Sequence, residues 1–128
     1  MKHIPAIAGG LLGLLFIVFG LNFFLNFIPV PEGPPPPAEV LSFMGALVPT
    51  GYLKFVKILE ILGGLLVALP KTRNWGLLVL GPILVNILCF HAFLQKGEGL
   101  FSPMLIGLCA LAVYLLWDAR KKFAGLLN

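Results

Sequence analysis

Charged residues are scarce in this chain, at 11% of its 128 residues, whereas hydrophobic residues make up 59%. Soluble domains typically contain about 25% charged and roughly 45–50% apolar residues. A soluble fold of this length has too small an interior to bury so much apolar surface, so we expect the chain to be embedded in lipid. The net charge of +4 does not indicate a nucleic-acid partner, because the basic residues lie between apolar stretches, where they indicate membrane topology.

Cysteine and histidine are also rare, which limits metal and redox chemistry. The two cysteines, Cys89 and Cys109, provide neither a disulfide scaffold nor a CxxC motif. They fall at similar depth on two predicted helices, where they are either a redox-active thiol pair or small apolar filler, the commoner role of buried cysteine. His91 is the only histidine inside a predicted helix, and a single imidazole makes a poor metal site. We therefore predict no metal site and leave the role of the two thiols open.

Four long apolar stretches dominate the sequence, at about 6–28, 51–69, 75–94 and 103–118. A helix of about 20 apolar residues crosses a bilayer, so each stretch is a predicted membrane span, the last one short. The first stretch is longer than the apolar core of a signal peptide and lacks an A-x-A-like cleavage site, so we expect it to be retained. Residues 38–47 show helical spacing of apolar residues but are too few to cross, which predicts a helix at the membrane interface.

Proline and glycine divide these segments. Residues 29–37, PVPEGPPPP, are expected to form an extended, polyproline-like connection. The turn at 49–51 ends the interfacial segment, Pro70 ends the second span, and Pro82 is expected to kink the third. The first span has small faces where a neighbouring helix can approach closely, at Gly9, Gly10, Gly13 and Gly20.

Basic residues lie almost entirely on one side of a four-span topology. That side holds Lys2, Lys71, Arg73, Arg120, Lys121 and Lys122. The connections on the opposite side contain Lys96 together with Glu32, Glu39 and Glu98. Because basic residues favour the cytoplasmic side, we expect both termini in the cytoplasm and the protein in a bacterial inner membrane. Trp75 and Trp117 would then lie at the cytoplasmic interface, as in an aromatic belt.

The second span is unusual because it contains Lys54, Lys57 and Glu60. An ionisable group at membrane depth costs about 2.5–3.5 kcal/mol, so such groups usually pair, turn inward and mark a site or a pathway. Lys57 and Glu60 are three residues apart and can pair within one helix. The sequence leaves open whether they do, and whether the pair only fixes helix packing or also holds a proton or a ligand. Lys54 is close enough to the interface to extend its amine to water.

Four further polar residues within the predicted spans lie in the same half of the membrane as Lys54, Lys57 and Glu60, away from the basic loops. They are Asn22, Asn26, Asn86 and His91. Because three helices contribute, we predict a polar cavity that opens toward the outer face and is partly covered by residues 38–47. Asn86 and His91 are five residues apart, roughly 140° around an ideal helix, so we expect Asn86 to face the second span and His91 to line the mouth. Hydrogen bonds between helices are the plainer role for the three asparagines.

Three segments show a specific combined pattern: GLNFFLNFIP at 20–29, TGYLKFVKILEILGGLLVALPK at 50–71 and GPILVNILCFHAFL at 81–94. Through them the sequence resembles the DoxX-like family of small four-helix membrane proteins over most of its length. The residues that carry the pattern are Lys57, Glu60, Gly63-Gly64, Asn86 and His91. The resemblance implies one all-α domain over 1–128, an integral membrane antiparallel four-helix bundle with a short interfacial helix between spans one and two.

The resemblance implies a fold more firmly than an activity. Relatives in the wider superfamily are tied to quinone-linked sulfur oxidation, to thiol-stress complexes or to receptor assembly, and its architecture is similar to that of vitamin K epoxide reductase. This chain lacks the paired-cysteine motif that disulfide exchange needs, which argues against direct thiol oxidoreduction.

From these features we expect an accessory, non-catalytic membrane protein. Its cavity would bind either a small amphipathic molecule, such as a lipid or a quinone, or a protein partner. The partner would be another membrane protein or a second copy of the chain. Lys57 and Lys54 would attract an anionic or carbonyl group, and Glu60 would balance charge and accept a proton. Asn86 and Asn22 would orient the ligand. Two alternatives remain open, a quinone-linked membrane oxidoreductase subunit and a small transporter acting as an oligomer. The transporter is disfavoured because the chain has no inverted repeat and its polar groups stop at mid-membrane.

Overall fold

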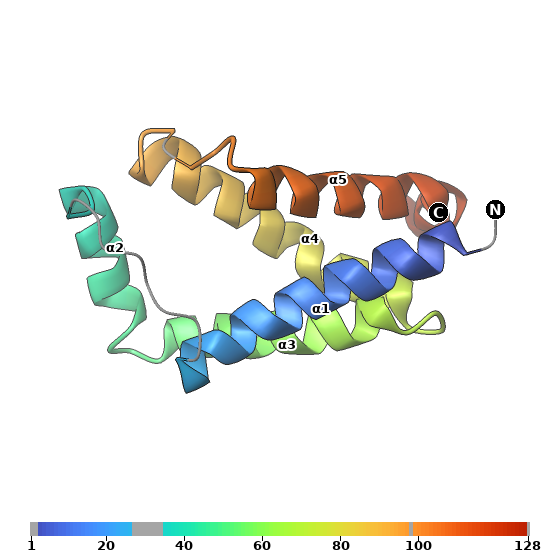
Figure 1. Cartoon of the computed structure of the whole chain (residues 1–128), viewed down its shortest axis with the longest axis horizontal. Coiled ribbons are helices and arrows are strands. Elements are labelled where there is room, and N and C mark those ends of the chain that lie inside the picture. The colour runs from blue at the N-terminus through green and yellow to red at the C-terminus, as the bar shows by residue number, and fades with distance from the viewer. Residues whose placement is uncertain (1–2, 27–34, 98, 128) are drawn as a thin grey trace.

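The computed structural model describes residues 3–26, 35–97 and 99–127, and within these ranges the chain is helical and contains no strand. Four long helices lie side by side (Figure 1): α1 (Ile4–Leu25), α3 (Tyr52–Ala68), α4 (Arg73–Cys89) and α5 (Pro103–Asp118). The shorter elements are α2 (Ala38–Leu47), the π-helix η1 (Phe90–Leu94), α6 (Arg120–Ala124) and the 3₁₀ turn η2 (Gly125–Leu127). The predicted all-α class is confirmed.

Each predicted helical segment corresponds to helical structure. The bounds predicted at 38–47 and 103–118 match α2 and α5, and the other bounds differ by a few residues. The first helix is shorter than the predicted 6–28, because Asn26 adopts a left-handed φ of 52° and ends it. The turn before α3 contains Gly51 with a φ of 83°, and α3 ends before Pro70, as predicted. The proline-rich connection predicted for 29–37 lies mostly outside the described residues. Its last residue, Pro37, has the polyproline-like angles φ −56° and ψ 155°.

The third predicted span changes its helix type near its end. Pro82 lies inside α4 without ending it, and the chain stays helical through Leu94. In η1 the hydrogen bonds reach one residue further than in an α-helix, and the Gln95 N–H donates to the Phe90 carbonyl at 3.0 Å. No pattern in the sequence predicts this π-helix.

Two of the helical stretches are long and apolar enough to cross a membrane, namely α1 and α4 together with η1, each of 22 residues. The two other predicted spans are shorter, because α3 has 17 residues and α5 has 16. At about 1.5 Å per residue they extend ~24–26 Å, below the ~30 Å hydrocarbon core of a typical bilayer.

Glycine contacts bring α1 directly against α3. A Cβ added to Gly64 would lie 2.7 Å from the carbonyl oxygen of Gly13, and one added to Gly20 would lie 2.6 Å from the Ile61 side chain. Both distances are too short for a real carbon atom, so these positions require glycine. Gly10 faces open space instead. Of the glycines predicted to allow a close helix approach, Gly13 and Gly20 therefore pack on α3, whereas Gly9 packs on the Arg73 side chain.

A similar contact joins α3 to α4. A Cβ on Gly63 would lie 2.7 Å from the Leu80 side chain, and one on Gly76 would lie 2.5 Å from the backbone nitrogen of Val67. Through these residues the face of α3 that carries Gly63 and Val67 packs closely on α4. Glu60 lies on the same face, one turn earlier, which explains why its side chain is buried.

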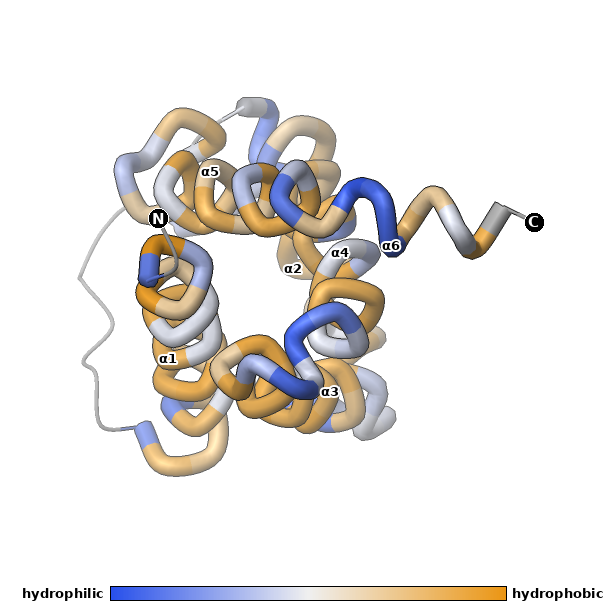
Figure 2. Tube along the Cα trace, turned by 90° about the vertical axis from the view of Figure 1, so that its right-hand side faces the viewer, coloured by the Kyte–Doolittle hydropathy of each residue, from blue (hydrophilic) through white to orange (hydrophobic). Residues whose placement is uncertain are grey.

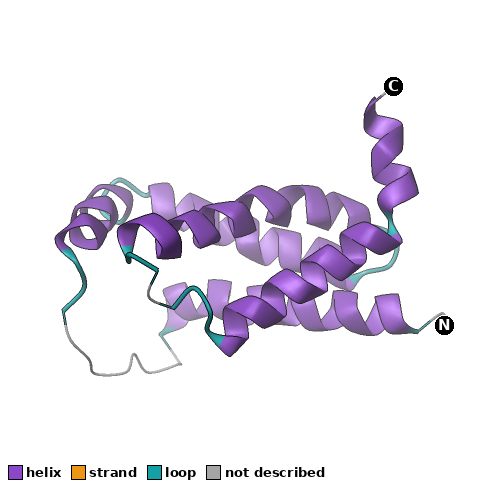
Figure 3. Cartoon of the chain, turned by 90° about the horizontal axis from the view of Figure 1, so that it is seen from above, coloured by secondary structure: helices purple, strands orange, loops and turns teal. Residues whose placement is uncertain are grey.

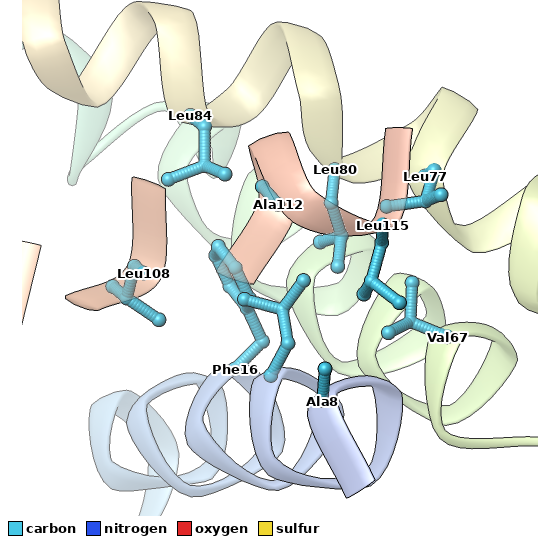
Figure 4. Packing of buried hydrophobic residues seen from close by; sticks show 10 residues of the cluster. Ala8, Phe16, Val67, Leu77, Leu80, Leu84, Leu108, Ala112 and Leu115 are labelled. Atoms are coloured by element: carbon cyan, nitrogen blue, oxygen red, sulfur yellow. The ribbon is translucent and has the colours of Figure 1, made fainter. Parts of the chain in front are cut away.

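The apolar core joins all four long helices (Figure 4). The positions of its residues along the helices place it mainly in one half of the molecule. Its members are Ala8, Leu12, Phe16, Val67, Leu77, Leu80, Leu84, Leu108, Ala112 and Leu115. Most of them come from the N-terminal halves of α1 and α4 and the C-terminal halves of α3 and α5. These halves meet at the end of the molecule where the two termini lie (Figure 1). The opposite half is where the large cavity described below is found.

The most basic segments lie at the end with the termini. In Figure 2 the turn between α3 and α4 and the start of α6 have the hydrophilic colour, whereas the long helices are mostly hydrophobic. Helix α6 leaves the direction of the long helices at a steep angle (Figure 3). Large apolar side chains remain exposed along every long helix, including Leu14, Leu65, Leu78 and Val113. An apolar exterior of this extent requires lipid or protein partners around it.

Candidate functional site

A cavity of about 1020 Å³ lies between α1, α2, α3, α4, η1 and α5, in the half of the molecule away from the termini. We call it the large cavity. Most of its lining is apolar and includes Phe16, Phe19, Leu53, Val56, Ile83 and Leu108. Its volume is at the upper end of the ~300–1,000 Å³ typical of small-molecule sites. An occupant must therefore present mainly hydrocarbon to these walls.

One ion pair interrupts the apolar lining. Lys57 Nζ lies 3.1 Å from Glu60 Oε2, so the two residues pair within α3 and not across helices. Glu60 is only 4% exposed and is the one buried charged side chain in the part of the chain that the structure describes. The Lys57 side chain is 24% exposed, and both residues line the large cavity. The ammonium has three donors, so Lys57 can bind a second acceptor while it keeps Glu60.

Asn86 and His91 also line the large cavity, although an ideal α-helix would separate them. The Asn86 side-chain amide donates to the carbonyl of Pro82 at 3.1 Å, one turn back along α4. His91 Nδ1 lies 2.9 Å from the carbonyl of Ile87. A carbonyl only accepts, so Nδ1 carries the proton and Nε2 of the neutral ring is an acceptor. The large cavity is wide, so both residues border it although they lie five positions apart.

Three residues predicted for the site are not among those that line the large cavity. Lys54 is exposed on the outside of α3, one turn before Lys57. Asn22 is half-buried near the end of α1 and already has an interaction partner. Asn26 is exposed, and its backbone ends α1. The structure therefore brings together four of the seven predicted site residues.

Helix α2 borders the open side of the large cavity, and this agrees with the predicted covering segment. Phe43, Met44 and Leu47 line the cavity. The ring centroids of Phe43 and Phe90 are 5.8 Å apart, and Lys96 lies 3.9 Å from Glu39 at the start of α2. These two contacts connect α2 to η1 and to the turn after it. Phe90 was missed by sequence reasoning because one phenylalanine among eleven gives no signal of its own.

The two thiols lie in different surroundings. Cys89 is exposed and lines the large cavity, whereas Cys109 is half-buried on α5 and packs against the apolar core. Both are free thiols. Within the described ranges no three histidine, cysteine or acidic side chains gather in a way that could hold a metal ion.

Comparison with known proteins finds a similar protein but does not indicate an activity. No family model matches the chain. The chain is similar to the uncharacterised protein YwoB of Bacillus subtilis (strain 168), with 33% identity over 75 residues. This match covers 59% of the chain and 47% of the relative, so it spans about half the length of that protein. No solved structure matches.

Proposed function

We propose that this chain is a DoxX-like integral membrane protein with an accessory, non-catalytic role, and that its large cavity binds a small amphipathic molecule. The exposed apolar faces of all four long helices and the two stretches of spanning length support the membrane location. In this arrangement the four long helices form an antiparallel bundle that crosses the membrane. Helices α3 and α5 match a locally thinned bilayer, which is a modest distortion.

The charge distribution supports an orientation with both termini in the cytoplasm. Lys71, Arg73 and the start of α6 lie at the end with the termini, and basic residues favour the cytoplasmic side. Trp75 and Trp117 are 68% and 64% exposed near this end, as expected for side chains at a membrane interface. The large cavity then lies in the outer half of the bilayer, with α2 at the outer surface.

The observation that carries the proposal is the Lys57–Glu60 pair, with its carboxylate buried, on the wall of an otherwise apolar cavity. A hydrocarbon tail fits the phenylalanine and leucine walls, while Lys57 donates to a carbonyl or anionic oxygen of the head. His91 Nε2 can accept a hydrogen bond from a hydroxyl of the same molecule. Lipids and quinones both combine a polar oxygen head with an apolar tail, so both belong to the proposed ligand class.

Native mass spectrometry of the protein, extracted from its own membrane in mild detergent, tests this proposal. We expect a discrete extra mass on the wild type that is lost in Glu60→Gln. The matched control is Lys54→Gln, which removes an exposed charge from the same helix and should keep the extra mass. Bare protein in all three samples would reject a ligand role for the cavity.

The identity of the bound mass separates the alternatives. A bound quinone whose absorbance changes when the protein is reduced would support a quinone-linked oxidoreductase subunit instead of an accessory protein. Flux of the released molecule into proteoliposomes would support a transporter.

A further inference from the structure

A second cavity, of about 430 Å³, lies at the opposite end from the large cavity, where the turn before α4, the end of α5 and the start of α6 meet. We call it the basic cavity. Four cationic side chains line it, namely Arg73, Arg120, Lys121 and Lys122. Asp118 is the one carboxylate in the lining, and no ion pair within the described ranges includes it. The cavity therefore has a large excess of positive charge.

Arg73 is held in place without a partner for its charge. Its Nε donates to the Val67 carbonyl at 3.1 Å, and its guanidinium packs on Gly9, where an added Cβ would collide with it. Its Nη2 is buried and has no hydrogen-bond partner within the described ranges. Arg73 therefore contributes an uncompensated positive charge to the wall of the basic cavity.

Arg120 is positioned as well. Its Nη1 donates to the Trp117 carbonyl at 2.8 Å, and its guanidinium carbon lies 4.3 Å from the centre of the Trp117 ring. Lys121 and Lys122 are exposed beside it, and the described part of the chain contains no ion pair with either. Two guanidinium groups held by hydrogen bonds and two exposed ammonium groups are a donor set typical of phosphate recognition.

The start of α4 adds to this field. Its capping residue, Thr72, makes no side-chain cap to the helix, and its first turn contains no acidic residue. The first N–H groups of a helix carry partial positive charge and favour a nearby anion.

We propose that the basic cavity binds the phosphate of an anionic phospholipid in the cytoplasmic leaflet. The exposed Trp75 and Trp117 place the cavity at headgroup depth, and α6 runs across the direction of the long helices, as a segment along the membrane surface would (Figure 3). Asp118 and Asn74 also line the cavity and can accept hydrogen bonds from headgroup hydroxyls, which favours a glycerol headgroup. The assignment rests on the proposed membrane location.

The test is native mass spectrometry of the full chain in detergent, titrated with phosphatidylglycerol or with phosphatidylcholine of the same acyl chains. We expect the wild type to prefer phosphatidylglycerol. The variant Lys121→Gln/Lys122→Gln should weaken this binding by about thirtyfold, since each lysine contributes about 1 kcal/mol. The control is Lys71→Gln/Lys96→Gln, which removes the same charge from residues outside the basic cavity and should change binding less than about twofold. Equal binding of the two lipids, or an equal loss in the control, overturns the proposal.

A competition experiment distinguishes lipid from free phosphate. Millimolar inorganic phosphate should leave most of the phosphatidylglycerol bound, because the acyl chains add affinity. Displacement of the lipid by phosphate would assign the cavity to a soluble anion and overturn the lipid assignment.

The result also separates the two proposals. Protein that does not fractionate with membranes contradicts both. Protein that does so and keeps a Glu60-dependent adduct, but shows no lipid preference, contradicts only the basic-cavity assignment.

Discussion

Gly13 and Gly64 meet backbone to backbone, and each occupies the space that a side chain on the other would need. This contact fixes how closely α1 and α3 approach. Gly64→Ala places a Cβ 2.7 Å from the Gly13 carbonyl oxygen, so the helices must separate. We expect a loss of stability of about 1–3 kcal/mol, measured by thermal unfolding in detergent.

The matched control is Gly10→Ala in α1, the helix that carries Gly13. A Cβ added at Gly10 has nothing within 4 Å. Alanine is the better helix former, so this variant should be neutral or slightly stabilised, by up to ~1 kcal/mol. Equal destabilisation of both variants would show that the close approach of α1 and α3 does not limit stability.

The Lys57–Glu60 pair should matter more when one member is lost than when both are replaced. Glu60→Gln leaves Lys57 without its carboxylate, but the Lys57 side chain is 24% exposed and can turn toward water. We therefore expect a loss of about 1–3 kcal/mol, below the ~3–5 kcal/mol typical of a fully buried pair. The double variant Lys57→Met/Glu60→Leu should return close to the wild-type unfolding temperature.

The double variant Lys57→Met/Glu60→Leu also serves as a folding control for the ligand experiment. If the double variant is folded and stable but carries no extra mass, the charged pair is needed for ligand retention independently of folding. A double variant as unstable as the single one would mean that the charges are needed for folding itself.

The helices could be predicted from the sequence because apolar runs and prolines mark them locally. Pro70 and the turn before α3 gave correct ends, while Asn26 ended α1 earlier than the apolar run suggested. The change to a π-helix after Cys89 has no comparable local signal. Asn86 and His91 were both predicted to border the cavity, and both do.

The site was predictable only in part, because the rotation of each helix about its axis decides which polar side chains face inward. In α1 that rotation follows from the glycines, whose contacts turn Gly13 and Gly20 toward α3. The glycines in the sequence indicated which face of α1 packs on α3. They did not indicate that Asn22 and Asn26 would then lie away from the large cavity. For Lys54, depth in the membrane was a poor guide, since it shares a helix with Lys57 but not the cavity.

The two thiols should differ strongly in reactivity. Cys89 is exposed on the large cavity, whereas Cys109 is half-buried against the core. A small maleimide should therefore react fast with the Cys109→Ser variant, in which Cys89 is the remaining thiol. It should react much more slowly with Cys89→Ser, in which Cys109 remains. Mass spectrometry of the labelled protein over time measures both rates. Faster labelling of Cys109 would mean that the large cavity is closed or filled.

The proposed orientation predicts opposite labelling of two lysine positions at opposite ends of the molecule. Lys71 lies in the turn between α3 and α4, and Lys96 follows η1. In a Cys89→Ser/Cys109→Ser background, Lys96→Cys should react with a membrane-impermeant maleimide in intact cells without an outer membrane. Lys71→Cys should react only after permeabilisation. Residue 71 lies at the end of the molecule with most of the basic residues, and such an end is retained in the cytoplasm.

The outcome of this labelling decides the leaflets of both cavities together. Reaction of both positions from one side would contradict the crossing of the membrane by α4 and η1, and with it the membrane arrangement of the bundle. A reversed pattern would keep the bundle but move the large cavity to the cytoplasmic leaflet. The basic cavity would then face the outside, where the anionic headgroups of the cytoplasmic leaflet are out of reach.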